Sequence, residues 1–323
     1  CRDVGIPVNT ILLGSDLEKM DDKELQLRLH EVSILAKLMP MQKSRVVKAL
    51  QAQGHTVGFM GDGINDAVAL RDADVGISVD TAVDIAKESA DIILLEKDLM
   101  VLRKGVIYGR RTFGNIIKYI KMAASSNFGN MFSVLGASAL LPFLPMLPTQ
   151  ILLNNILYDI SEIPIPLDKV DAADIRSPRV LDMNFVRNFM LVIGPISSLF
   201  DFLTFYVMLV VLQAGEKLFQ TGWFVESLCT QVLVIFIIRT RGNPLKSRAH
   251  PLLTFTSLIV VACAILIPFT PVGTYFGFVP PPAKFYVILG SMTLAYLFIV
   301  ELAKQGFYRW AAAGSPRRPP AGR

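Results

Sequence analysis

The chain has 323 residues, of which 52% are hydrophobic and only 18% are charged, and its mean hydropathy is +0.48. Soluble domains carry roughly 25% charged residues, so the composition excludes a single soluble globule. The charges are also uneven, because residues 1–112 hold 15 Lys/Arg and 17 Asp/Glu, whereas residues 113–323 hold 17 and 10. The first third is therefore predicted to be soluble and the rest to lie in a membrane.

The net charge of +5 does not indicate a nucleic-acid partner, because the basic residues after residue 112 form short clusters between apolar runs. The three cysteines, Cys1, Cys229 and Cys263, lack CxxC spacing, and two of them lie inside apolar runs. Neither a disulfide framework nor a zinc site is predicted. The chain starts at Cys1 without a signal peptide, and we expect it to be a fragment of a longer protein.

Strand-length apolar runs alternate with helical patterns through the first hundred residues, which predicts a parallel sheet covered by helices. The expected strands are Thr10–Gly14, Ile34–Met39, Thr56–Met60, Val75–Val79 and Asp91–Leu95. The run from Ile92 to Leu95 is continuously apolar, which predicts a strand buried on both faces.

A long helix with a basic start follows from Gly105, and six apolar stretches come after it. They lie at about 122–144, 146–166, 189–212, 222–238, 252–272 and 283–303. Each is near the roughly 20 residues that cross a hydrocarbon core, although the fourth is short. The links after the second and fourth stretches carry four Lys/Arg each and the tail carries five, while the opposite links carry none or one. The soluble part and the tail are therefore predicted to be cytoplasmic.

The expected organisation has five parts. They are a soluble α/β domain (1–104), a stalk helix with the first two spans (105–166), a cytoplasmic loop (167–188), four further spans (189–305) and a disordered cytoplasmic tail (306–323).

A glycine-rich loop holds the candidate catalytic residues. It reads Gly58-Phe59-Met60-Gly61-Asp62-Gly63-Ile64-Asn65-Asp66 and follows a predicted strand, where open α/β sheets place their ligands. Gly61 and Gly63 let the backbone approach a phosphoryl group closely. Asp62 offers a hard oxygen to Mg²⁺, and Asn65 and Asp66 can cap the next helix. The alternative is that these residues only form a turn.

The motif continues as Ala67-Val68-Ala69-Leu70 and Ala73-Asp74-Val75-Gly76-Ile77, and Pro40-Met41-Gln42-Lys43 precedes it at a helix start. This assembly resembles the phosphorylation domain of P-type ATPases, which has a haloacid-dehalogenase-like fold. The resemblance implies that Asp62 binds the catalytic Mg²⁺, that Lys43 contacts the phosphoryl group, and that Asn65 and Asp66 complete the pocket. A positioned ammonium and a metal ion also suit phosphoryl transfer on physical grounds.

The family's nucleophile, an aspartate in an Asp-Lys-Thr-Gly motif, does not occur in these residues, nor do the nucleotide-binding and actuator domains. The chain is therefore expected to be inactive alone and to need the missing N-terminal part of the same pump, which binds ATP. Two alternatives stay open: a membrane-tethered phosphatase, for which Asp16 lacks the expected sequence context, and a non-catalytic membrane module.

Polar residues inside the first two predicted spans indicate a cation site, because such residues are costly in lipid. The candidate ligands of the transported cation are Asn127, Asn130, Asn155, Asp159 and Glu162. The asparagines can equally hold helices together, whereas Asp159 lacks an obvious cationic partner. Pro164 and Pro166 place Glu162 near the cytoplasmic exit. Helix packing or interface exposure is the expected role of Asp201, Glu226 and Glu301.

The resemblance extends to these spans, because cation pumps of the family carry ligands in patterns that match Ser125-Ser126-Asn127 and Asn155 to Asp159. Asn130 stands where calcium pumps carry glutamate, which argues against calcium. The run Lys118–Asn130 and the segment Leu141–Pro148 look like the bacterial magnesium-transporting branch. The resemblance thus implies a multi-pass pump of the inner (plasma) membrane, in contact with lipid, that imports Mg²⁺; Ca²⁺ or another cation is the alternative.

Overall fold

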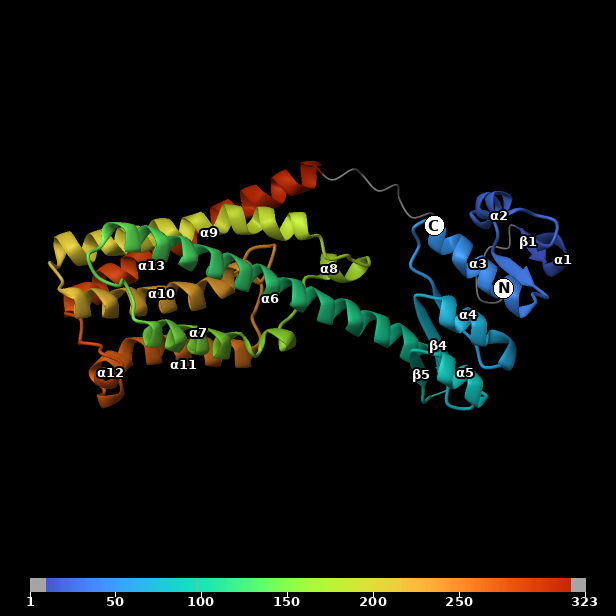
Figure 1. Ribbon diagram of the computed structural model, residues 1–323, viewed down its shortest axis with the longest axis horizontal. Helices are drawn as coiled ribbons and strands as arrows, with labels where there is room; N and C mark the ends of the chain where they lie inside the picture. The colour runs from blue at the N-terminus through green and yellow to red at the C-terminus, as the bar shows by residue number, and fades with distance from the viewer. Residues whose placement is uncertain (1–9, 97, 315–323) are drawn as a thin grey trace. The chain divides into compact units, whose positions relative to one another are not determined.

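The computed structural model describes residues 10–96 and 98–314, and the chain divides into two units after Val106 (Figure 1). In the first unit the elements are β1 (Ile11–Leu13), α1 (Gly14–Leu17), α2 (Asp22–Leu29), β2 (Ile34–Ala36), α3 (Pro40–Ala52), β3 (Gly58–Met60), the 3₁₀ turn η2 (Ile64–Asp66), α4 (Ala67–Asp72), β4 (Val75–Val79), α5 (Asp84–Ser89) and β5 (Ile92–Leu94).

The five strands form two parallel sheets, where one sheet was predicted. One sheet pairs β1 with β2, and the other has the order β3-β4-β5 with Gly58 opposite Val75 and Ile77 opposite Ile92. Each sheet has its own apolar cluster. The cluster beside the first sheet consists of Leu12, Leu17, Leu25, Leu29, Val46 and Ala49. The cluster beside the second sheet consists of Leu70, Ala82 and Ala86.

The prediction that the last strand is buried on both faces is wrong. Ile92 is 44% exposed and Ile93 is 41% exposed, while Leu94 is buried. The reason is the position of β5, which among the described residues pairs only with β4 and therefore lies at an edge. An apolar run alone does not distinguish a central strand from an edge strand.

The second unit is helical. Its elements, with the long helix that leads into it, are α6 (Leu99–Leu140), α7 (Pro148–Glu162), the 3₁₀ turn η3 (Ile165–Leu167), α8 (Ala172–Arg176), α9 (Met183–Tyr206) continued by the π-helical turn η4 (Val207–Val211), α10 (Glu216–Ile238), α11 (Pro251–Leu266) continued by η5 (Ile267–Phe269), α12 (Pro271–Tyr275) and α13 (Ala283–Gly314).

Four helices of the described residues are long and apolar enough to cross a membrane. They are Met183–Val211, Glu216–Ile238, Pro251–Phe269 and Ala283–Ala311. Glu216–Ile238 is the predicted short fourth span, and at 23 residues it is long enough. Of its most apolar 18-residue stretch 83% is buried, so α10 is the central helix of the bundle. It packs against α7, α9, α11 and α13.

The other two predicted spans are not among these four, so the count of six remains a prediction. The helix α7 has only 15 residues. The helix α6 has 42 residues, but polar side chains such as Ser125, Ser126, Asn127 and Asn130 lower the hydropathy of its apolar part.

The tail prediction needs correction, because α13 continues to Gly314 instead of ending near residue 305. Phe307 in this extension is buried, and its ring lies against those of Phe185 and Phe189 of α9. This packing stabilises the additional turns. The disorder predicted for the remaining tail falls on residues 315–323, which lie outside the described residues.

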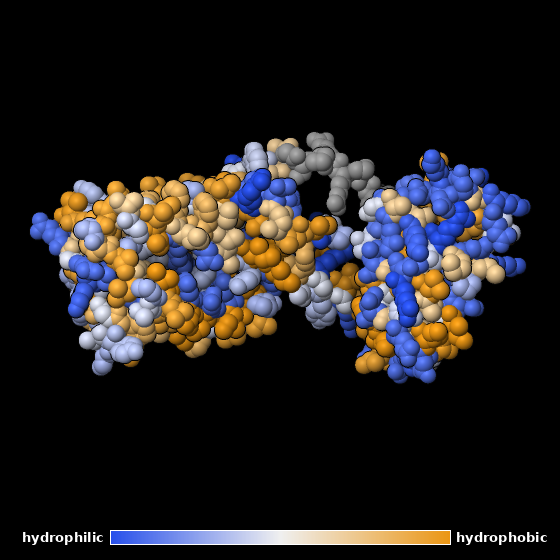
Figure 2. Space-filling view, viewed as in Figure 1, coloured by the Kyte–Doolittle hydropathy of each residue, from blue (hydrophilic) through white to orange (hydrophobic). Residues whose placement is uncertain are grey.

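The surface of the helical unit is rich in apolar side chains, as the orange atoms over its helices in Figure 2 show. Apolar residues that are more than half exposed on these helices include Leu199, Phe255, Leu294 and Phe298. Such broad apolar exposure is unusual in a water-soluble bundle and is typical of contact with lipid. With four long apolar helices, it identifies a membrane protein.

Candidate functional site

The first candidate site, which we call the strand-end site, consists of Lys43, Gly61, Asp62 and Asp66. These residues line one cavity of about 670 Å³ beside the carboxyl end of β3. Asp62 follows β3, Asp66 ends the η2 turn, and Lys43 lies in the first turn of α3, which begins at Pro40. Proline suits this position because its fixed backbone angle favours a helix start. The fold thus brings Lys43 to the same cavity as Asp62 and Asp66.

The central contact of the strand-end site is an ion pair. The Lys43 ammonium lies 2.6 Å from Asp66 Oδ1, and the backbone N–H of Gly63 donates to Asp66 Oδ2 over 3.2 Å. Burial raises the pKa of the Asp66 carboxyl, but the hydrogen bonds from Lys43 and Gly63 outweigh burial and hold the pKa below its ordinary value. Asp66 is therefore an anion that fixes the position of the ammonium.

The backbone around Asp62 is held by three hydrogen bonds to the neighbouring elements. The Gly61 N–H donates to the carbonyl of Ile77 in β4, and the hydroxyl of Ser78 donates to the Gly61 carbonyl over 2.9 Å. The N–H of Val83 donates to the Asp62 carbonyl. These bonds fix the loop while the Asp62 side chain stays exposed at the cavity.

The described residues contain no cluster of three or more His, Cys, Asp or Glu side chains with metal-site geometry. Mg²⁺ does not require one, because it binds through one or two carboxylates and completes its shell with water and phosphate oxygens. The exposed carboxylate of Asp62, beside the anionic Asp66, fits this requirement. Gly63 and Asn65 do not line the cavity, and Asn65 is exposed.

A second candidate region lies along α6 and α7, where the predicted cation ligands line two separate cavities. The first, which we call the amide cavity, has a volume of about 400 Å³. Its polar lining consists of Asn127, Asn130, Asn154, Asn155 and Ser227, and Trp223 closes part of it. The sequence prediction did not name Ser227 as a ligand, because α10 reads as a plain apolar helix.

The side chain of Asn130 is held from α10. Gln231 donates from Nε2 to Asn130 Oδ1 over 3.0 Å and also donates to the hydroxyl of Ser227. Gln231 is 3% exposed, and Asn154 Oδ1 is buried without a hydrogen-bond partner. The amide cavity therefore combines neutral oxygen donors from three helices.

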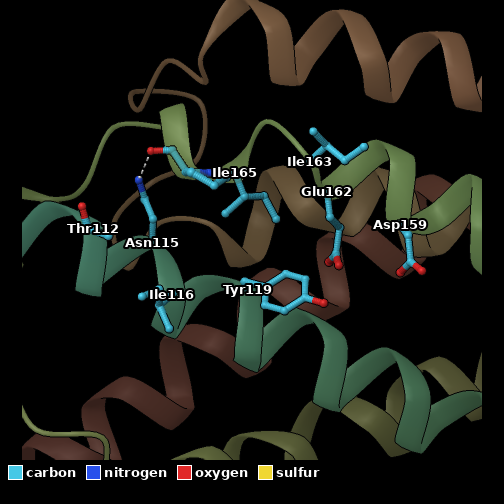
Figure 3. Close-up of a pocket in the computed structure, with 9 residues that line it drawn as sticks. Thr112, Asn115, Ile116, Tyr119, Asp159, Glu162, Ile163 and Ile165 are labelled. Atoms are coloured by element: carbon cyan, nitrogen blue, oxygen red, sulfur yellow. Dashed lines mark hydrogen bonds between the residues drawn. The ribbon is translucent and has the colours of Figure 1, made fainter.

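The second cavity, which we call the carboxylate cavity, has a volume of about 510 Å³ (Figure 3). It is lined by Asp159 and Glu162 of α7 and by residues of α6, namely Thr112, Asn115, Ile116 and Tyr119. Figure 3 shows the Glu162 carboxylate turned toward the Tyr119 hydroxyl across the space between the helices. Glu162 is 3% exposed, and the buried Tyr158 one turn earlier on α7 is a hydrogen-bonding neighbour of its carboxylate.

The five predicted cation ligands therefore do not line one cavity. Asn127, Asn130 and Asn155 line the amide cavity, whereas Asp159 and Glu162 line the carboxylate cavity. Asn155, Asp159 and Glu162 are spaced by four and three residues, which puts them on one face of α7. This spacing does not reveal how the neighbouring helices divide the space beside that face.

The buried acid Asp201 of the membrane unit is engaged in helix packing, as expected. Asp201 accepts hydrogen bonds from Ser133 of α6 over 2.6 Å and from Trp223 of α10 over 2.8 Å. It joins α9 to both helices. Glu301 lies 2.7 Å from the Lys304 ammonium on its own helix.

The fold and the two regions define a class: a membrane protein whose helices carry oxygen-lined cavities and whose α/β unit carries a lysine–carboxylate pair at its strand ends. The sequence profile described as "Cation transporting ATPase, C-terminus" matches residues 143–306, which is half of the chain. The chain belongs to this family of cation-transporting ATPases.

Individual relatives agree with this membership. "Magnesium-transporting ATPase, P-type 1" of Salmonella typhimurium strain LT2 is 52% identical over 313 residues, which cover 95% of this chain and 34% of the relative. The protein of the same name in Escherichia coli K12 is 50% identical over 95% of this chain and 35% of its own length. "Probable cation-transporting ATPase F" of Mycobacterium tuberculosis strain H37Rv is 37% identical over 47% of this chain and 18% of its own length.

The resemblance to the magnesium-transporting branch of P-type ATPases, predicted from the motifs, is confirmed by these matches. The chain spans about a third of the length of the magnesium-transporting relatives it matches.

Proposed function

We propose that this chain is the C-terminal part of a P-type ATPase that imports Mg²⁺ into the cytoplasm. The observation that carries the proposal is the convergence of Lys43, Asp62 and Asp66 on one cavity, in a chain that is about half identical to magnesium-transporting ATPases over 95% of its length. ATP binds elsewhere in the pump, and an aspartate in the part that precedes this segment accepts the phosphoryl group.

In this proposal the first unit is part of a haloacid-dehalogenase-like phosphorylation domain. Asp62 would hold the catalytic Mg²⁺, which supplies positive charge to the phosphoryl group when it is bound. The Lys43 ammonium, fixed by Asp66, provides a second positive charge at the same cavity. Gly61 permits the close approach of Asp66, and Gly63 binds Asp66 through its N–H. Asn65 is exposed and does not line the cavity, so its proposed part in the pocket is a contact with the bound phosphoryl group.

In the membrane unit we propose six spans, with α6 and α7 added to the four long apolar helices. The soluble unit and the C-terminal end of the chain face the cytoplasm of the cell, and the pump lies in the inner (plasma) membrane. The support is the distribution of Lys and Arg, which gather in the links after the second and fourth spans and in the tail.

The proposed transport site is built from Asn127, Asn130 and Asn155 in the amide cavity together with Asp159 and Glu162 in the carboxylate cavity. Mg²⁺ keeps several of its waters when proteins bind it, so neutral amide oxygens and one or two carboxylates suit it. Ca²⁺ sites commonly use more carboxylates. The chain would encounter lipid along the exposed apolar faces of its helices and needs no nucleic acid.

The test of the proposed chemistry is phosphorylation of the intact protein by radiolabelled ATP. The substitution Asp62→Ala is expected to abolish phosphoenzyme turnover, because the metal loses its carboxylate. Lys43→Met is expected to slow turnover by about 10²-fold, as when one charge-stabilising donor is lost from an active site. ATP hydrolysis at the unsubstituted rate in Asp62→Ala would contradict the assignment.

A matched control lies one and a half turns further along α3. Lys48 pairs with Asp72 but is 62% exposed and does not line the cavity, so Lys48→Met is expected to turn over at the unsubstituted rate. An equal loss in both lysine variants would show that the helix, and not the ammonium at the strand-end site, is affected.

A further inference from the structure

Two acidic side chains meet inside the helical bundle, outside both cavities. Asp201 of α9 is 2% exposed and Glu226 of α10 is 1% exposed, and neither lines the amide cavity or the carboxylate cavity. The two carboxyl groups form a hydrogen bond with each other. An ionised carboxylate can only accept a hydrogen bond, so this contact needs a hydrogen atom on one of the two groups. The pair therefore holds a proton.

The hydrogen bonds around the pair indicate which group carries the proton. Asp201 Oδ2 accepts from the Ser133 hydroxyl over 2.6 Å, and Asp201 Oδ1 accepts from Trp223 Nε1 over 2.8 Å. Hydrogen bonds donated to a carboxylate favour its ionised form. Asp201 is therefore the anion of the pair, and Glu226 is the acid that donates to it.

The surroundings provide no cation that would replace the proton. No ion pair of the described residues includes Asp201 or Glu226. The titratable side chains near the pair are Cys229 of α10 and Tyr296 of α13, and these residue types are ordinarily neutral at neutral pH. A second negative charge would be buried without a counter-ion, which strongly favours the protonated form of Glu226.

The pair is connected to the amide cavity through α10. The indole of Trp223, which donates to Asp201, lines that cavity, and so does Ser227, the residue after Glu226. A divalent cation in the amide cavity would therefore lie near the pair, and its positive charge would favour loss of the Glu226 proton. The effect is reciprocal, because loss of the proton leaves a second negative charge that strengthens cation binding.

We infer that Asp201 and Glu226 form a proton-binding site between α9 and α10, in which Glu226 carries the proton, Asp201 accepts its hydrogen bond, and the proton is released to water when a divalent cation enters the amide cavity. The release rests on the proposed transport function, whereas the shared proton does not. Neither carboxyl group is a ligand of the cation in this inference. The site instead makes cation binding depend on pH.

The proton is tested by infrared spectroscopy of the intact protein at neutral pH, where the C=O stretching band of a protonated carboxyl is separate from that of a carboxylate. Glu226→Gln is expected to remove such a band, while the new amide still donates to Asp201. Asp201→Asn is expected to shift the band without removing it, because the asparagine oxygen still accepts from Glu226. Glu301→Gln is the control, because Glu301 pairs with Lys304 and is expected to be ionised. A band that persists unchanged in Glu226→Gln, or that disappears in Asp201→Asn, would overturn the inference.

The coupling is tested by adding Mn²⁺ to the weakly buffered intact protein and measuring the released protons, with bound Mn²⁺ counted from the electron paramagnetic resonance signal of the free ion. Glu226→Gln is expected to release fewer protons than the unsubstituted protein, by up to about one per chain, because a carboxyl group holds one proton. Equal release from both proteins would overturn the coupling. If Asn127→Ala binds as much Mn²⁺ as the unsubstituted protein, the proposed transport site fails, whereas the infrared result still decides whether Glu226 carries a proton.

Discussion

At the scale of single residues, the strand-end site depends on how closely Asp66 packs against its own loop. A Cβ atom added to Gly61 would lie 2.4 Å from Asp66 Cβ and 2.8 Å from Asp66 Oδ2. A Cβ atom added to Gly63 would lie 3.6 Å from Asp66 Oδ2, which is an ordinary van der Waals distance. The two glycines of the motif therefore have different steric roles.

The substitution Gly61→Ala is expected to displace Asp66 and with it the Lys43 ammonium. Phosphoenzyme turnover of the intact protein should fall by about 10²-fold, since misplacement of catalytic groups by about 1 Å has effects of this size. Gly63→Ala, the matched control, should retain most of the turnover. Equal activity of the two variants would show that the contact between Gly61 and Asp66 does not position the lysine.

At this scale the sequence predicted which residue types meet at the strand-end site but not how they pair. Lys43 and Asp66 are 23 positions apart, and no spacing rule relates a helix start to a turn at that separation. The unpartnered oxygens of Asn115 and Asn154 could not be predicted either, because a missing partner becomes visible only when all neighbours are placed.

At the scale of elements, a buried carboxylate joins the membrane helices at one end. Asp168, which follows η3, accepts hydrogen bonds from Lys118 of α6 over 2.8 Å and from both Nε and Nη2 of Arg239 at the end of α10. It also accepts from the N–H of His250, which precedes α11. The side chain of Asp168 is fully buried, so three helices depend on one anion.

Replacing this carboxylate is expected to destabilise the helical unit strongly. Asp168→Ala leaves the ammonium of Lys118 and the guanidinium of Arg239 buried without a counter-ion, a change that costs about 3–5 kcal/mol. The thermal midpoint of the purified protein, measured at one scan rate, should fall. Asp171→Ala is the control, because Asp171 binds the Thr240 hydroxyl and a backbone N–H and its loss leaves no buried charge unpaired. An equal fall in both variants would contradict the argument.

The same contact predicts a pH dependence. Burial raises the pKa of Asp168, but Arg239 and Lys118 outweigh burial and hold the pKa below the ordinary value of 3.8. A carboxyl whose pKa is lower in the folded state stabilises the fold above that ordinary value and loses this effect as the pH falls through the folded pKa. The thermal midpoint should therefore drop on acidification below about pH 4, and Asp168→Asn should show a smaller drop. Identical pH profiles would contradict the assignment.

Elements were predicted better than their assembly. The strand Val75–Val79 has the predicted bounds. All described strand pairs are parallel, as predicted, because strand-length apolar runs that alternate with helices pack into parallel sheets. The division into two sheets and the exposure of Ile92 depend on strand neighbours, which apolar periodicity does not specify. The extension of α13 to Gly314 depends on packing of Phe307 against α9, which is a tertiary effect.

At the scale of the whole molecule, the proposed phosphoryl-transfer site lies in one unit and the proposed transport site lies in the other. The helix α10 is surrounded by its neighbours, while α11 and α13 present apolar side chains outward, as expected of helices in lipid. The amide cavity and the carboxylate cavity both lie along α6 and α7. Coupling between the two units requires two states that differ in ion affinity.

The most direct test of this account is ATP-driven movement of Mg²⁺ by the intact protein in sealed vesicles. With the soluble domains outside and a Mg²⁺-sensitive dye inside, added ATP is expected to lower the Mg²⁺ concentration inside the vesicles. Asn127→Ala and Asp62→Ala should each abolish the change. ATP hydrolysis without movement of Mg²⁺, or movement of Ca²⁺ in its place, would contradict the central claim.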